Sequence, residues 1–98
     1  MARISEKVRN YSRAKGTCNT ERAVYEAIQR TLDTMFDIRC STQRKWGYDW
    51  YESAYYGCYD EARKELLSKP CCIAQTVALQ CIDDLESLYE QMKELERR

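Results

Sequence analysis

Cysteine is the residue in this sequence with the widest range of chemistry, because a thiolate can bind a metal, attack an electrophile or form a disulfide. Structural zinc sites draw their ligands in close pairs, with about two to four residues between the members of a pair. Apart from one adjacent pair, the cysteines here are much further apart, so the sequence predicts no metal site. The six cysteines are Cys18, Cys40, Cys58, Cys71, Cys72 and Cys81.

Cys58 and Cys81 are the best-placed pair for a disulfide. A helical hairpin is expected around Pro70, and the two cysteines lie at similar distances before and after that turn, on facing stripes. The adjacent Cys71 and Cys72 are expected to stay reduced or to pair separately. A redox role for this adjacent pair is a minor alternative, since the start of a helix lowers the pKa of a thiol.

The chain has no histidine. This excludes the commonest general base, the catalytic triads that depend on it and most catalytic zinc sites. No glycine-rich phosphate-binding loop occurs either. The carboxylate pairs Asp60-Glu61 and Asp83-Asp84 are adjacent in sequence, so on a helix the members of each pair point about 100° apart and do not converge. We therefore expect no catalytic residue, no cofactor and no enzymatic activity.

The aromatic residues are concentrated in one segment, residues 46–59, which holds seven of the eleven in the chain. The spacing of Tyr51 and Tyr55 places both on the core stripe of a predicted helix. Trp, Tyr and Arg dominate protein interfaces, because each brings a large rigid contact area with a polar tip. We predict a partner-binding surface formed by Arg44, Lys45, Trp46, Tyr48, Trp50 and Tyr56.

A protein partner is the main prediction, because the acidic Asp49 and Glu52 alternate with cations in a mixed rim. In a second interpretation the tryptophans fold over the bundle as a lid. In a third, unpaired bases stack on the aromatic rings, and Arg44, Lys45 and a basic N-terminal helix bind the phosphates. A net charge of zero and a pI near 6.3 count against nucleic acid.

The function predicted from these features is that of a non-enzymatic protein-binding module. A small intracellular inhibitor or adaptor, of the kind that phages and mobile elements encode, fits this description. The alternative is a nucleic-acid-binding protein.

The composition favours helices. Three glycines and one proline leave little turn chemistry for a β fold, and 44% apolar with 33% charged residues is an ordinary globular composition. We predict an all-α fold, a single domain over residues 1–98, built as a small up-and-down bundle of four helices. The predicted helices cover about 3–15, 20–38, 49–66 and 70–96, with residues 39–48 as the longest loop and Gly57 at a close contact between helices.

The last helix has the clearest pattern, an unbroken apolar seam with alternating spacings of four and three that is typical of bundles and coiled coils. At 1.5 Å per residue this helix is about 40 Å long and its partners are about 28 Å, so its end is predicted to overhang the bundle. The overhang is either a surface for self-association into a dimer or for docking, or it is covered by the first helix or the loop. Its residues are Leu88, Met92 and Leu95.

Charge is unevenly distributed along the chain. Residues 1–17 hold five basic residues and one acidic residue, for a charge of +4, whereas residues 82–98 carry −3. We expect two solvated helix faces that attract each other. No stretch approaches the roughly 20 apolar residues of a membrane span, and the charged start does not resemble a signal peptide. Both features predict a cytoplasmic protein with no membrane partner, although six cysteines are commoner in oxidised, secreted domains.

Overall fold

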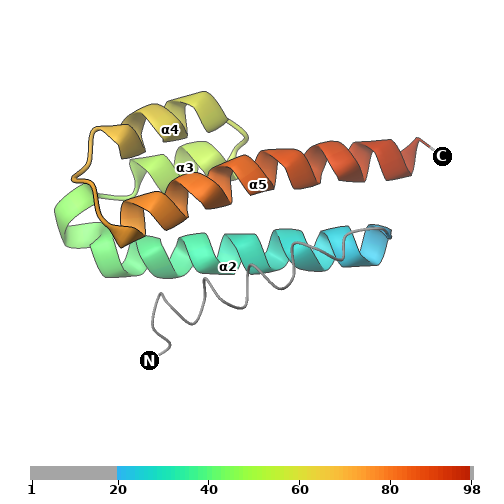
Figure 1. Ribbon diagram of the computed structural model, residues 1–98, viewed down its shortest axis with the longest axis horizontal. Coiled ribbons are helices and arrows are strands. Elements are labelled where there is room, and N and C mark those ends of the chain that lie inside the picture. Colours follow the sequence, from blue (N-terminus) through green and yellow to red (C-terminus); the bar gives the residue numbers. More distant parts are fainter. Residues whose placement is uncertain (1–19, 98) are drawn as a thin grey trace.

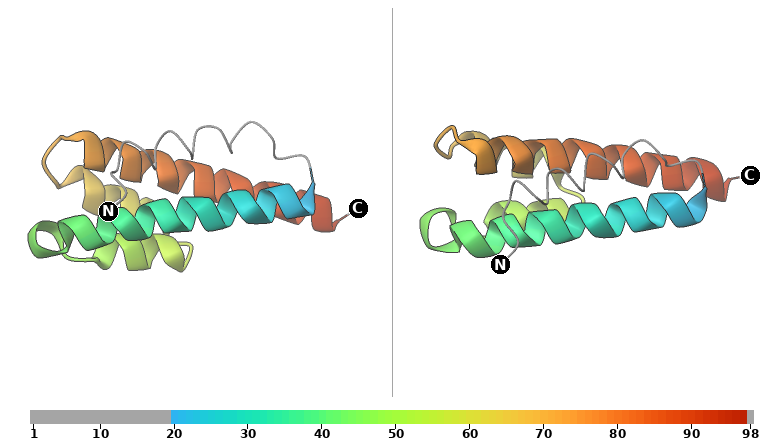
Figure 2. Two further views of the ribbon diagram at one scale, coloured as in Figure 1. Left: turned by 90° about the horizontal axis from the view of Figure 1, so that it is seen from below. Right: turned by 60° about the horizontal axis from the view of Figure 1, so that its bottom comes forward.

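The computed structural model describes residues 20–97, which form an all-α, up-and-down bundle (Figure 1). The two longest helices lie antiparallel, and the two short ones form a hairpin that covers only one half of that pair (Figures 1 and 2). The predicted fold class is therefore confirmed, while the helix predicted over 3–15 lies outside the described residues. The helices are α2 (Glu21–Trp46), α3 (Asp49–Tyr55), α4 (Tyr59–Leu67) and α5 (Ile73–Glu96).

The helix α2 starts where the sequence predicts and ends later. The Thr20 hydroxyl accepts a hydrogen bond from the Ala23 amide at 3.1 Å and caps the first turn. The predicted end at Ile38 and the predicted loop over 39–48 are wrong, because α2 continues to Trp46. No glycine or proline interrupts residues 39–46, and basic side chains in the last turn suit the negative end of the helix dipole.

Gly47 ends α2 and turns the chain back. Its amide donates to the Gln43 carbonyl at 2.9 Å, and its backbone angles are φ 70° and ψ −160°. This combination of angles is essentially restricted to glycine. The turn allows α3 to begin only two residues later and to run back along α2.

The helix predicted over 49–66 is split into α3 and α4 at Gly57, which has φ 86°. The Gly57 amide donates to Ala54 at 3.1 Å and the Cys58 amide donates to Ser53 at 2.7 Å, the second bond being the long-range bond of a Schellman helix end. A Cβ at Gly57 would meet no atom within 4 Å. The predicted close helix contact is thus wrong, and this glycine is required for its backbone conformation.

The core lies between α2 and α5 and is closed on one side by α3 and α4. The seam predicted for the last helix is confirmed in its central part, where Ala78, Cys81 and Leu85 are fully buried. The amide of Gln75 donates to the carbonyls of Leu66 and Lys69, both at 3.0 Å, and so binds the α4–α5 turn to the first turns of α5.

Within residues 20–97, no helix is both long enough and apolar enough to cross a bilayer.

Replacement of Gly47 by alanine is expected to lower the free energy of unfolding by about 1–3 kcal/mol, because a Cβ disfavours the backbone angles of this turn. Urea denaturation followed by circular dichroism measures the change. Ser87→Ala, at an exposed position within α5, is the control and should leave the midpoint unchanged or slightly raised. An unchanged midpoint for Gly47→Ala would show that the turn tolerates other conformations.

Candidate protein-interaction surface

Arg39 is at the centre of an aromatic cluster on the outer face of α2 and α3. Its guanidinium carbon lies 5.4 Å from the ring centre of Phe36, 5.2 Å from that of Tyr48 and 5.5 Å from that of Tyr51. Each contact of this kind contributes about 0.5–1 kcal/mol at an exposed site. Three rings around one cation hold the long Arg39 side chain in a single position.

The rings continue outward from Arg39 as a connected series. Tyr51 packs edge-on to Phe36 and next to Tyr55, both with 6.1 Å between ring centres, and Tyr55 meets Tyr56 at 5.4 Å. Tyr56 is the most exposed, with 78% of its surface open to solvent, and Phe36, Tyr48 and Tyr55 are between 41% and 53% exposed. We call this cluster the Arg39 surface: Phe36, Arg39, Tyr48, Tyr51, Tyr55 and Tyr56.

The extended α2 and the Gly47 turn together create the Arg39 surface. Phe36 and Arg39 are three residues apart on α2, so they lie on one face of the helix. The turn then returns α3 along this same face, where Tyr51 and Tyr55, four residues apart, form the opposite half. Had α2 ended at Ile38, Arg39 would lie in a loop and its side chain would have no fixed direction.

Trp50 points from α3 in the opposite direction, into the core. It is 1% exposed, and its ring lies edge-on to Tyr51 with 6.1 Å between centres. The prediction that Trp50 belongs to a partner-binding surface is therefore corrected: a buried indole has no surface to offer a partner. Trp46 is half-buried and packs against the core cluster. Both tryptophans thus serve packing first, but they do so from the helices α2 and α3 and not from the loop that the lid interpretation assumed.

The other predicted binding residues divide into two groups. Tyr48 and Tyr56 are exposed and belong to the Arg39 surface, and their role in binding a partner stays a prediction. Arg44 and Lys45 are exposed in the last turn of α2, and neither forms a cation–π contact within residues 20–97.

Sequence reasoning missed four members of the Arg39 surface: Phe36, Arg39, Tyr51 and Tyr55. The spacing of Tyr51 and Tyr55 predicts a core stripe, and Arg39 falls in the predicted loop over 39–48. The three-residue spacing of Phe36 and Arg39 indicates that both lie on one face of a helix, but only if that helix continues past Ile38.

The electrostatics of the Arg39 surface leave one cation without a carboxylate partner among the described residues. No ion pair within residues 20–97 involves Arg39, and its Nε is buried without a hydrogen-bond partner there. Burial raises the pKa of the Tyr51 hydroxyl above its ordinary value. The neighbouring Tyr55 and Asp33 raise this pKa further, whereas the positive charge of Arg39 lowers it. The tyrosine therefore stays neutral at physiological pH and keeps its proton as a hydrogen-bond donor.

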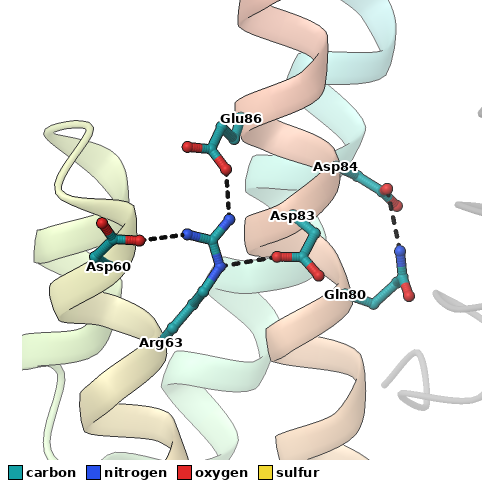
Figure 3. Close-up of polar contacts among 6 residues, drawn as sticks. All are labelled: Asp60, Arg63, Gln80, Asp83, Asp84 and Glu86. Atoms are coloured by element: carbon teal, nitrogen blue, oxygen red, sulfur yellow. Dashed lines mark hydrogen bonds and ion pairs between the residues drawn. The ribbon is translucent and has the colours of Figure 1, made fainter.

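A second polar cluster joins α4 to α5 (Figure 3). The Arg63 guanidinium donates to Asp60 of its own helix at 2.9 Å and, across the interface, to Asp83 at 2.9 Å and to Glu86. The hydrogen bonds to Glu86 and Asp83 raise the pKa of Arg63, so it remains charged. All three guanidinium nitrogens of Arg63 donate hydrogen bonds to carboxylates of the protein itself, so this cluster stabilises the packing of α4 on α5.

The adjacent carboxylates Asp83 and Asp84 point apart, as predicted. Asp83 turns to Arg63, whereas Asp84 accepts a hydrogen bond from the Gln80 amide at 3.1 Å (Figure 3). Among the described residues, no group of three or more acidic, cysteine or histidine side chains is arranged to hold a metal ion.

The predicted disulfide between Cys58 and Cys81 is not formed in the structure. Cys58 is exposed at the start of α4, whereas Cys81 faces the core and is fully buried. The prediction assumed one continuous helix, and the break at Gly57 removes the facing register that it required. Cys40, Cys71 and Cys72 are also free and exposed.

The predicted overhang of the last helix is corrected by the length of α2. The helix α2 has 26 residues and α5 has 24, and the two lie side by side over most of their length (Figures 1 and 2). Leu88 is 6% exposed, and Met92 and Leu95 are half-buried against the core cluster. Self-association through these three residues is untested and stays a prediction.

We expect Arg63→Met, which keeps most of the aliphatic stem, to lower the free energy of unfolding by about 1–2 kcal/mol. The reason is that a network with two hydrogen bonds across an interface stabilises the fold more than an isolated surface ion pair does. Arg22→Met is the matched control: its single pair with Glu26 lies within α2 and is exposed, so its loss costs about 0.3–0.5 kcal/mol. Urea denaturation at low and high salt compares them. Equal losses for the two variants would contradict a role for Arg63 in holding α4 on α5.

The thiol of Cys81 is expected to resist alkylation in the folded protein. Burial raises its pKa to about 12, and Asp84 adds to the rise, so almost no thiolate is present at pH 8. Iodoacetamide labelling followed by peptide mass spectrometry should modify Cys40, Cys58 and Cys72 within minutes and Cys81 only after denaturant is added. Labelling of Cys81 at the rate of the exposed cysteines would show that α5 opens readily.

Comparison with known proteins gives no match: no protein-family model, no curated protein and no solved structure matches this chain. Of the features described, the Arg39 surface is the one that combines exposure, fixed geometry and the side chains typical of interfaces.

Proposed function

We propose that this protein is a non-enzymatic binding protein that engages a partner protein through the Arg39 surface. The supporting observation is the exposed series of rings around a fixed arginine. Contiguous apolar area left open to water usually marks an interaction site, because burial of that area lowers the free energy. Tyrosine and arginine are also the residues that contribute most to binding at interfaces.

The geometry favours tight binding by this surface. Each ring contacts another ring or the guanidinium of Arg39, so few side-chain rotations remain to be lost when a partner binds. The exposed hydroxyl groups of Tyr55 and Tyr56 supply hydrogen bonds at the edge of an apolar contact. A rigid patch of this kind needs no rearrangement before binding.

Charge supports a protein partner over nucleic acid. Residues 20–97 contain fifteen acidic and ten basic residues, a net charge of −5. Binding of a phosphate backbone depends on several lysines and arginines along one face, whereas the Arg39 surface has one arginine with Asp33 nearby. The nucleic-acid alternative depends on residues 1–17, outside the described part, and on Arg44 and Lys45.

An exposed patch of fixed geometry suits a protein that acts by covering a surface of its partner. A rigid patch on a short bundle either covers a site on its partner, as an inhibitor does, or joins two partners, as an adaptor does. By analogy with the small inhibitors that phages and mobile elements encode, we propose an intracellular role of this kind.

The test is capture of the partner from lysate of the native host with the tagged chain, with and without nuclease, followed by affinity measurement with the purified partner. Tyr56→Ala is expected to weaken binding at least tenfold without a change in stability, since this ring is 78% exposed. Leu67→Ala is the control: it removes an exposed apolar side chain, 67% exposed, on α4. Alkylation of the complex locates the contact without mutation. A partner bound at the Arg39 surface should protect the nearby Cys40 thiol and leave the Cys72 thiol reactive.

Two results would contradict the proposal. Equal affinity of the wild type and Tyr56→Ala, with Cys40 still reactive in the complex, would place the contact elsewhere. Loss of all capture on nuclease treatment, with a steep salt dependence that Arg44→Ala reduces, would support the nucleic-acid alternative.

A further inference from the structure

A groove of about 580 Å³ lies between the start of α2 and the end of α5. It opens on the half of the α2–α5 pair that the α3–α4 hairpin does not cover (Figures 1 and 2). On α5 its lining comes from the last two turns of the helix. The lining residues are Glu21, Arg22, Tyr25, Ile28, Gln29, Tyr89, Met92 and Glu96.

The groove continues the face of α2 that α3 covers further along. Tyr25 precedes Phe36 by eleven residues and Gln29 precedes it by seven, so all three lie on one side of the helix. At Phe36 this side is packed against Tyr51 of α3. At the groove, no helix of the described residues takes the corresponding place, because the α3–α4 hairpin ends at Gly57.

The walls of the groove match those of a helix-binding site. Ile28 is 4% exposed and Met92 is half-buried, which gives an apolar floor, and the exposed rings of Tyr25 and Tyr89 stand at its sides. Amphipathic helices bind in such grooves through apolar side chains spaced by three and four residues. Residues 21–29 span about 12 Å, which is a little over two turns of a bound helix.

The charged groups of the groove that have no ion-pair partner among the described residues are negative. Glu21 and Glu96 line it, and neither forms an ion pair within residues 20–97. Arg22, the basic residue of the lining, is paired with Glu26. Glu96 is the last residue of α5 and Glu21 is the first residue of α2, so the negative end of one helix dipole and the positive end of the other meet here, and the negative potential comes from the two carboxylates. A bound segment with basic residues beside its apolar stripe would therefore be attracted.

We propose that this groove binds a short, basic amphipathic helix of a partner protein. The bound helix takes the place relative to α2 and α5 that α3 takes in the other half of the bundle. Its apolar side chains contact Ile28 and Met92, and its lysines or arginines lie near Glu21 and Glu96. This site is separate from the Arg39 surface and does not depend on the function proposed for that surface.

The test uses the full chain with 13C-labelled methionine methyl groups and three synthetic peptides. The first has a leucine stripe with Lys and Arg on its polar face, the second has the same stripe with Glu, and the third is a scrambled form of the first. Met92 lines the groove and Met35 is fully buried in the core, so the two signals separate binding from a global change. We expect a saturable shift of Met92 with the first peptide, a constant Met35 signal, and at least tenfold weaker binding of the other two.

Matched variants locate the charge and the apolar contact. Glu96→Gln and Tyr89→Ala are expected to weaken binding of the basic peptide by at least threefold, whereas Glu61→Gln, an exposed glutamate on α4, should leave it unchanged. Tyr56→Ala should also leave it unchanged, so failure of the Arg39 surface and failure of the groove are distinguishable.

Three results would overturn the proposal. The first is equal binding of the basic and acidic peptides, or no shift of Met92 with either. The second is a Met92 signal that changes with protein concentration in the absence of peptide, which would assign the groove to a second copy of the chain. The third is a change of that signal in Ile4→Glu without peptide, which would assign the groove to the N-terminal segment of the same chain.

Discussion

Burial of Trp50 is the interaction on which the candidate binding surface depends. A short helix such as α3 gains little stability from its own backbone and is held by what it buries. With the indole of Trp50 in the core, the rotation of α3 about its axis is set, and the neighbouring Tyr51 must face outward toward Arg39. The packing of one aromatic side chain thus decides which other rings reach the surface.

The bundle is asymmetric because its helices differ in length. The α2–α5 pair extends along the whole molecule, whereas the α3–α4 hairpin covers one half, where Arg63 holds it against α5. The covered half carries the aromatic Arg39 surface on its outside, and the uncovered half leaves an open groove with an acidic lining. Two surfaces of different chemistry therefore follow from a single feature of the fold.

Much of the fold could be predicted from local patterns. The cap at Thr20 and the apolar seam of α5 are properties of neighbouring residues, and both appear where expected. The same reasoning was wrong for residues 39–46, because a weak local period does not reveal that a helix is stabilised by α3 packed against it. It also placed Gly57 inside a helix, because the positive φ of this residue is not visible in the sequence.

The sequence by itself determined the fold class, the absence of histidine and the concentration of aromatic residues in residues 46–59. Only the tertiary structure decided which of those aromatics are buried and which are exposed. The physical reason is that Trp50 and Tyr51 are adjacent and similar in hydrophobicity, so their roles depend on the rotation of α3 against the core. Residue types and spacing specify the available contacts, and packing selects those that face inward.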